Sequence, residues 1–224
     1  MLPRILLDTA EIAGSNETLR LIQRGTEYSI MLGANELMNS RLSGSEEALA
    51  RLTCEKLSHV SKPRLLIGGL GMGFTLRAAL AELATGSEVI VAELVPEVVA
   101  WAKGAMAAHH GDSLSDPRTE IVTTDVARLI RQHDKHYDAI LLDVDNGPDG
   151  LTKGANDHLY SSDGLGRARR ALKDGGVLAI WSAAPDKQFS ARFASCGFEV
   201  EETIVRANKG KSGARHVIWL GVKH

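Results

Sequence analysis

The most constraining feature of the chain is an apolar run, residues 65–68, that enters a turn with glycine at alternating positions, Gly69, Gly71 and Gly73. A helix is expected over residues 75–84, and a second strand, residues 89–93, ends in Glu93. Glycines suit a sharp turn in which a ligand approaches the backbone closely. Glu93 follows Gly73 by about twenty residues, the usual distance for an acid that binds ribose hydroxyls. The pattern predicts a nucleoside-binding βαβ unit.

Composition limits the class of protein. The 224 residues are 44% hydrophobic and 24% charged, which is normal for one globular domain or one domain with a small appendage. The formal net charge of −2 gives no reason to expect nucleic acid or a membrane as a partner. Two cysteines, no secretory apolar core and no long apolar run favour a soluble protein of the reducing cytoplasm.

The chain divides near residue 62. Residues 1–61 are predicted to form short strands at 5–7, 19–23 and 28–32, followed by a helix. The pattern Ser43-Gly44-Ser45-Glu46 predicts a capping box at the start of that helix, which should run to about residue 58. Residues 1–61 are therefore expected to be a small N-terminal β-appendage, and residues 62–224 the nucleoside-binding domain.

Strands and helices alternate from residue 62 onward, and two final strands, residues 198–205 and 216–222, are joined as a hairpin. Alternation predicts an α/β fold with a mostly parallel sheet that is covered on both faces. The closing hairpin makes the last strand antiparallel. The predicted architecture is a seven-stranded, methyltransferase-like (Rossmann-like) sheet.

Acids follow three of the predicted strands, and a parallel sheet places them at one edge beside the glycine turn. Glu93 is placed for the ribose, and Asp125 for an adenine amino group or as a helix cap. Asp143, with Asp145 two residues further on, is placed at the reacting centre. The neighbouring residues Leu94 and Val126 are assigned with Glu93 and Asp125 to the nucleoside site.

Several segments resemble the spermidine synthase family of aminopropyltransferases and, more broadly, methyltransferase-fold enzymes. These segments are residues 65–69, 75–77, 91–94, 137–143, 147–148, 159–161 and 169–177. The resemblance implies that Glu93 binds ribose, that Asp125 binds adenine and that Asp143 receives the proton of an attacking amine. It also implies S-adenosylmethionine or its decarboxylated form as donor, a small-molecule acceptor and a homodimer formed through the N-terminal appendage.

The sequence departs from the family pattern at the predicted polyamine site. Gly71 stands where family members carry the loop aspartate that holds the cationic end of decarboxylated S-adenosylmethionine. The family's Tyr-His-Glu triplet is aligned with residues 50–52, which places Arg51 at the substrate, and its second loop aspartate is aligned with Asn146. Because polycations require carboxylates or aromatic faces, ordinary putrescine is not the expected acceptor. Arg51 either binds an acidic group or lies on the solvent face of its helix.

Asp143 and Asp145 are the predicted catalytic residues, and Arg51, Asn146 and Tyr160 the predicted substrate-binding residues. Residues 144–159 are expected to order over the substrate. No His or Cys spacing indicates a metal site.

Three functions are consistent with these features. The first is a spermidine synthase-like transferase with a changed acceptor, including methyl transfer, which the substitutions favour. The second is a true aminopropyltransferase, and the third is a non-catalytic nucleoside-binding protein, which the presence of Asp143 disfavours.

Overall fold

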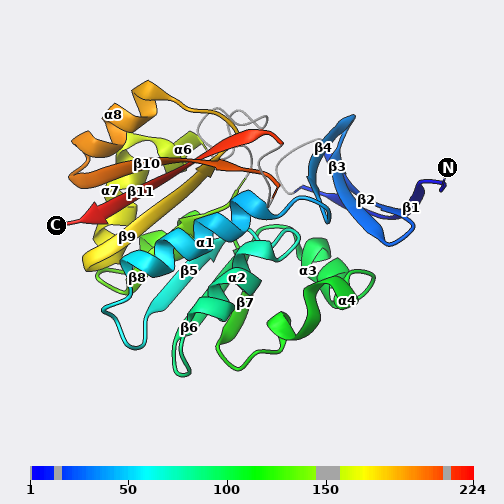
Figure 1. Cartoon of the computed structure of the whole chain (residues 1–224), viewed down its shortest axis with the longest axis horizontal. Helices are drawn as coiled ribbons and strands as arrows, with labels where there is room; N and C mark the ends of the chain where they lie inside the picture. The colour runs from blue at the N-terminus through cyan, green and yellow to red at the C-terminus, as the bar shows by residue number, and fades with distance from the viewer. Residues whose placement is uncertain (1, 13–16, 145–156, 209–212) are drawn as a thin grey trace.

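The computed structural model describes residues 2–12, 17–144, 157–208 and 213–224 (Figure 1). The N-terminal segment forms an antiparallel sheet of four strands in the order β1-β2-β3-β4. The strands are β1 (Ile5–Glu11), β2 (Thr18–Arg24), β3 (Glu27–Leu32) and β4 (Asn35–Asn39). The sequence prediction missed β4, because this short strand contains asparagine and glutamate, which have low β-propensity. Its pairing with β3 across the turn at Gly33 defines it instead.

The second sheet has seven strands in the order β10-β11-β9-β8-β5-β6-β7. Its members are β5 (Arg64–Gly68), β6 (Glu88–Glu93), β7 (Thr119–Thr123), β8 (Tyr137–Leu142), β9 (Leu172–Ser182), β10 (Phe198–Arg206) and β11 (Arg215–Lys223). Strand β11 runs antiparallel to β9 and β10, and the remaining pairs are parallel. The predicted α/β class and the C-terminal hairpin are confirmed.

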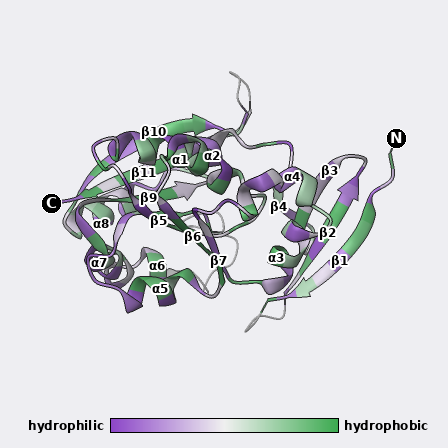
Figure 2. Cartoon of the chain, turned by 90° about the horizontal axis from the view of Figure 1, so that it is seen from below, coloured by the Kyte–Doolittle hydropathy of each residue, from purple (hydrophilic) through white to green (hydrophobic). Residues whose placement is uncertain are grey.

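Helices cover both faces of this sheet, with α1 and α2 on one side and α5, α6 and α7 on the other (Figure 2). The helices are α1 (Gly44–Lys56), α2 (Phe74–Glu82), α3 (Pro96–Lys103), α4 (Ala107–His110), η1 (Gly111–Leu114), α5 (Val126–Gln132), α6 (Asp157–Tyr160), α7 (Ser162–Ala171) and α8 (Lys187–Ser195). Strand β5 alternates between the two layers: Leu65 and Ile67 pack toward α1 and α2, whereas Leu66 packs in the opposite cluster. Two buried faces explain why the central strands are continuously apolar.

Helix α1 belongs to the core of the larger sheet. Leu49 and Ala50 are fully buried in the same cluster as Leu65 and Ile67. The boundary predicted near residue 62 therefore separates α1 from the sheet against which α1 packs.

The small sheet packs against the part of the larger unit that carries the glycine turn. Leu21 and Ile30 share a buried cluster with Met72 of the turn and with Trp101 of α3. The indole Nε1 of Trp101 donates a hydrogen bond of 2.7 Å to Asp8 of β1. Among the described residues, no helix combines the length and apolarity needed to cross a bilayer.

Candidate active site

The carboxyl ends of four neighbouring strands form one edge of the larger sheet. Pairing aligns one row of residues across these strands: Gly68, Ala92, Leu142 and Ile180. The residues that follow this row include Glu93, Asp143 and Trp181. The parallel register thus brings together two acids and an indole from distant parts of the sequence, beside the glycine turn.

The glycine turn packs tightly against the protein itself. Gly69, Gly71 and Gly73 have φ values of 91°, 47° and 70°, which disfavour any residue with a Cβ. A Cβ on Gly69 would lie 2.5 Å from the carbonyl oxygen of Asp143, and one on Gly71 would lie 2.8 Å from Sδ of Met38 in β4. These contacts fix the turn between β8 and the small sheet, so glycine is required here even before a ligand is considered.

Glu93 connects the glycine turn to the end of β6. Its side chain is buried, and its two oxygens accept hydrogen bonds of 2.9 Å from the backbone N–H groups of Leu70 and Val95. Burial raises the pKa of Glu93, and these backbone donors oppose the rise. The backbone N–H groups of Gly71 and Leu94 also stabilise this carboxylate, so Glu93 anchors the glycine turn through its backbone. The adjacent Leu94 is 46% exposed and presents an apolar surface beside this carboxylate.

Asp125 is the N-cap of α5, and its Oδ1 accepts a hydrogen bond of 2.8 Å from the backbone N–H of Ala127. The next residue, Val126, is buried against Gly68. A cavity of about 430 Å³ borders Asp125 and is also lined by His158 and Leu159. Capping occupies one carboxylate oxygen and leaves the other for a ligand in this cavity.

The two roles of Asp125 can be separated by comparing it with Ser161, the N-cap of α7, whose Oγ accepts from Gly164 N–H at 3.1 Å. We expect Asp125→Ala and Ser161→Ala each to lower the free energy of unfolding by about 1 kcal/mol, because each removes a cap. Only Asp125→Ala should weaken nucleoside binding. Urea unfolding and calorimetric titration with methylthioadenosine measure the two effects. Equal affinity in the two variants would leave Asp125 as a cap alone.

Asp143 lies directly after β8 and is half-buried. Its Oδ2 accepts a hydrogen bond of 2.5 Å from Oγ1 of Thr75, in the first turn of α2. Burial, followed by the nearby charge of Glu46, raises the pKa of Asp143 to about 7, although the bond from Thr75 opposes the rise. A carboxylate with this pKa accepts a proton near neutral pH more readily than an ordinary aspartate does.

Glu46 approaches Asp143 from the first turn of α1. Oγ of Ser45 donates a hydrogen bond of 2.7 Å to Oε2 of Glu46, and Thr75 Oγ1 lies 3.5 Å from the carbonyl oxygen of Glu46. Burial raises the pKa of Glu46 as well. Nδ1 of His216, on β11, lies 2.9 Å from Oγ of Ser45. Since Ser45 donates to Glu46, its oxygen accepts the Nδ1–H of His216. The result is a hydrogen-bonded chain from β11 to the acidic pair.

Trp181 completes this side of the site. Trp181 follows Ile180, which pairs with Leu142, so it is the penultimate residue of β9 and lies at the same edge of the sheet as Asp143. Its ring meets that of His216 edge to face, with centroids 4.7 Å apart. The indole Nε1 is buried without a hydrogen-bond partner among the described residues. A buried N–H donor of this kind is available to a ligand.

Ser45, Glu46, Thr75 and His216 were not identified from the sequence. The spacing Ser43-x-x-Glu46 predicted a capping box, which is wrong, since Ser43 makes no side-chain capping bond and Glu46 turns toward Ser45 instead. The helix start itself is confirmed at Gly44. His216 lies far from the other members in sequence and carries no local signal.

The predicted substrate residues occupy different surroundings. Arg51 is exposed and forms an ion pair of 2.6 Å with Glu55, one turn further along α1, so its side chain is not part of the acidic cluster. The first turn of α1, rather than residues 50–52, approaches Asp143. The assignment of Arg51 to the substrate stays a prediction. Tyr160 is buried, and its hydroxyl lies 3.3 Å from the carbonyl oxygen of Val144. Asp145 and Asn146 lie outside the described residues.

In the part of the chain that the structure describes, no group of three or more His, Cys, Asp or Glu side chains has a geometry that could hold a metal ion.

Comparison with known proteins gives a consistent result. Residues 45–189 match the spermine/spermidine synthase domain. A polyamine aminopropyltransferase of Saccharolobus solfataricus is 29% identical over 129 residues, which cover 58% of this chain and 41% of that protein. The matching segment thus spans less than half the length of this curated relative.

Two solved structures share the fold. The spermidine synthase of Thermotoga maritima superposes with a TM-score of 0.77 at 19% identity, covering 98% of this chain and 73% of that one. A spermidine synthase in complex with the transition-state analogue AdoDATO gives a TM-score of 0.80 at 20% identity, covering 98% of this chain and 74% of that one. Since the matched domain covers more than half of the chain and contains Glu46, Glu93, Asp125 and Asp143, this protein belongs to the spermine/spermidine synthase family.

Proposed function

We propose that this protein transfers an aminopropyl group from decarboxylated S-adenosylmethionine to an amine acceptor, with Asp143 as the proton acceptor. The observation that carries the proposal is the pair formed by Asp143 and Glu46 at the carboxyl edge of the sheet, in which burial and mutual repulsion raise the pKa of Asp143 to about 7. Such a pair attracts a cationic amine and provides a base for it. Membership of the family and the polyamine aminopropyltransferase relative support the same reaction.

The reaction requires little from the protein beyond alignment and proton removal. The nitrogen lone pair of the acceptor attacks the propyl carbon bound to sulfur. As the carbon–nitrogen bond forms, the carbon–sulfur bond breaks, sulfur keeps the electron pair and neutral methylthioadenosine leaves. The alkylated ammonium then gives its excess proton to the carboxylate of Asp143. The hydrogen bond from Thr75 fixes that carboxylate in position.

A carboxylate from another element lies near the glycine turn, in which Gly71 replaces the aspartate of the family pattern. The glycine turn carries no carboxylate of its own for the donor's ammonium group, but Glu46 brings one to the same edge from α1. We therefore propose that Glu46 supplies the negative charge that binds cationic substrate. This proposal favours aminopropyl transfer over the methyl transfer that Gly71 alone indicated.

Methyl transfer from S-adenosylmethionine is the second candidate. It is favoured by Gly71, because an aspartate in the turn would repel the carboxylate that only this donor carries. The tail of the decarboxylated donor is cationic, whereas the tail of S-adenosylmethionine carries a carboxylate beside its ammonium group, so Glu46 should attract the first more strongly than the second.

Calorimetric titration with the two donors, with methylthioadenosine as the reference, tests the proposed function. We expect the decarboxylated donor to bind more tightly than methylthioadenosine, and S-adenosylmethionine to bind more weakly than the decarboxylated form. The opposite order would establish methyl transfer as the better hypothesis. No binding of any of the three would contradict the nucleoside site as well.

The acidic pair also predicts a pH dependence. In the wild-type protein kcat should rise with pH and reach half of its plateau near pH 7, because Asp143 must be deprotonated to accept the proton. Glu46→Gln removes a charge that raises the pKa of Asp143, so the rise should move to lower pH. If Glu46 binds the cationic substrate, KM should increase as well.

Steady-state rates measured from about pH 5.5 to pH 9 test both effects of Glu46→Gln. This range extends about one to two pH units on either side of the expected midpoint. Glu55→Gln is a suitable control, since Glu55 lies on the same helix and is exposed in its ion pair with Arg51. An unchanged profile in Glu46→Gln would show that Glu46 does not act on Asp143.

A further inference from the structure

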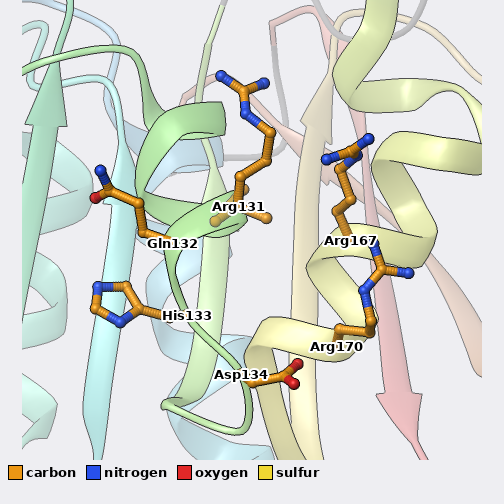
Figure 3. Close-up of a pocket in the computed structure, with 7 residues that line it drawn as sticks. Arg131, Gln132, His133, Asp134, Arg167 and Arg170 are labelled. Atoms are coloured by element: carbon orange, nitrogen blue, oxygen red, sulfur yellow. The ribbon is translucent and has the colours of Figure 1, made fainter.

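A second hollow, separate from the acidic pair, lies between α5 and α7. It has a volume of about 280 Å³, and its lining includes Arg131, Arg167 and Arg170. Figure 3 shows Arg131 extending from the end of α5 on one side, with Arg167 and Arg170 extending from α7 on the other. We propose that this arginine groove binds a phosphate-bearing anion.

The charges of the groove are only partly compensated. Arg167 forms an ion pair of 2.8 Å with Asp163, one turn earlier on α7. All three arginines lower the pKa of Asp163, Arg167 most strongly, so Asp163 is the carboxylate that they share. The side chains of Arg131 and Arg170 form no ion pair or hydrogen bond with any residue that the structure describes. Asp134 also lines the groove but pairs with neither of them. Within the described part of the chain, the guanidinium groups of Arg131 and Arg170 therefore have no partner that a ligand would have to displace.

The backbone holds the two sides of the groove together. The N–H of Lys135 donates to the carbonyl oxygen of Arg170 at 2.8 Å, and the N–H of His136 donates to that of Ala171 at 2.8 Å. These bonds join the segment after α5 to the last turn of α7. The spacing between Arg131 and the α7 arginines is consequently set before any ligand arrives, which reduces the entropy lost on binding.

A simpler role for these arginines is electrostatic. Arg131 and Arg170 lie in the last turns of their helices, where cations interact favourably with the helix dipole. That effect explains why each helix has a basic residue in its last turn. It does not explain why Arg167, away from the helix end, faces the same hollow. Three planar guanidinium groups around one hollow match the geometry of phosphate oxygens, which accept paired N–H bonds.

The hollow lies next to the cavity beside Asp125, since both are lined by Ile130, Arg131 and Arg167. A ligand that carries both a phosphate group and an adenine base could therefore extend toward Asp125, whereas inorganic pyrophosphate would occupy the arginine groove alone.

Calorimetric titration of the whole protein with inorganic pyrophosphate at fixed ionic strength tests the groove. We expect saturable binding with a Kd of about 1 mM or tighter. The double variant Arg131→Gln/Arg170→Gln should weaken this binding by about tenfold or more, since it removes two charge-assisted donors. Arg128→Gln is the matched control, because Arg128 is exposed on the same helix but does not line the groove. It should leave the affinity nearly unchanged.

A titration with ADP identifies the source of the phosphate. Tighter binding of ADP than of pyrophosphate indicates a nucleotide, and equal binding indicates a free phosphate compound. The absence of saturable pyrophosphate binding would overturn the proposal. The proposal would also be overturned if Arg128→Gln weakened pyrophosphate binding as much as the double variant does, or if the protein bound citrate as tightly as pyrophosphate. Either result would show that the protein responds to negative charge in general. Thermal unfolding of each variant separates lost binding from a lost helix-dipole contribution.

Discussion

Replacement of Asp143 by asparagine is expected to lower kcat by about 100- to 10,000-fold, the usual contribution of a positioned base. Asparagine has nearly the same shape and still accepts the hydrogen bond from Thr75, but it cannot take up the proton released by the attacking amine. Affinity for methylthioadenosine should change little, because the expected nucleoside contacts are Glu93 and Asp125. Single-turnover rates and calorimetric binding measure the two quantities separately.

Asp143→Asn should also change the stability of the protein, and this effect is a gain, whereas the effect on turnover is a loss. The pKa of Asp143 is raised from 3.8 to about 7 in the folded protein. The folded state therefore holds a proton that the unfolded state has lost between these values, and stability decreases as pH rises through this window. Because the asparagine side chain cannot ionise, the Asp143→Asn variant should be more stable than the wild type at pH 8 and nearly equal at pH 3.5 (about the lower limit of the window).

The combination of slower turnover and higher stability at pH 8 distinguishes a catalytic carboxylate from a structural one. Urea unfolding at both pH values provides the stability measurement. A variant that loses nucleoside affinity and turnover in equal proportion would contradict the assignment of Asp143 as the base. A variant that is less stable at pH 8 would contradict its raised pKa.

Gly69→Ala is expected to have the largest effect on stability, with a loss of about 3 kcal/mol or more in the free energy of unfolding. Gly69 has a φ of 91°, and a Cβ at this position would lie 2.5 Å from the carbonyl oxygen of Asp143. That oxygen belongs to the backbone and cannot move without displacing the end of β8. The substitution should therefore also weaken nucleoside binding, because it shifts the glycine turn relative to Glu93.

Gly33→Ala provides the control. Gly33 has a φ of 56°, but no atom within 4 Å would meet the added Cβ, so only the strain of the positive φ remains. A loss of about 1 kcal/mol is expected for it. Urea unfolding of both variants gives the difference caused by the contact with Asp143. Equal losses in the two variants would show that the turn can move away from β8 at little cost.

The local sequence contains much of the information that specifies this fold. The apolar run before Gly69 and the alternation of strands and helices predicted the parallel sheet, because a strand buried on both faces must be apolar throughout. The hairpin near the C-terminus predicted the antiparallel strand β11. The acids Glu93, Asp125 and Asp143 were located for the same reason: they follow strands, and parallel strands end at one edge.

The substrate side of the site was predicted less well, and the reason is physical. Glu46, Thr75, Trp181 and His216 come from four separate elements, and only the packing of α1 and the register of β9 and β11 bring them to Asp143. A capping-box pattern at Glu46 was a reasonable local interpretation, yet the side chain has an alternative partner in Ser45. Arg51 was assigned by alignment, but its face of α1 is directed to solvent.

The sequence by itself determined the order of elements, the sheet class and the acids at the strand ends, because these depend on periodicity and on residues close together in the chain. The tertiary structure alone decided that α1 lies in the core, that Met38 of the small sheet packs on Gly71, and that Glu46 lies near Asp143. Each of these depends on contacts between residues far apart in sequence, and on side-chain directions that local patterns do not specify.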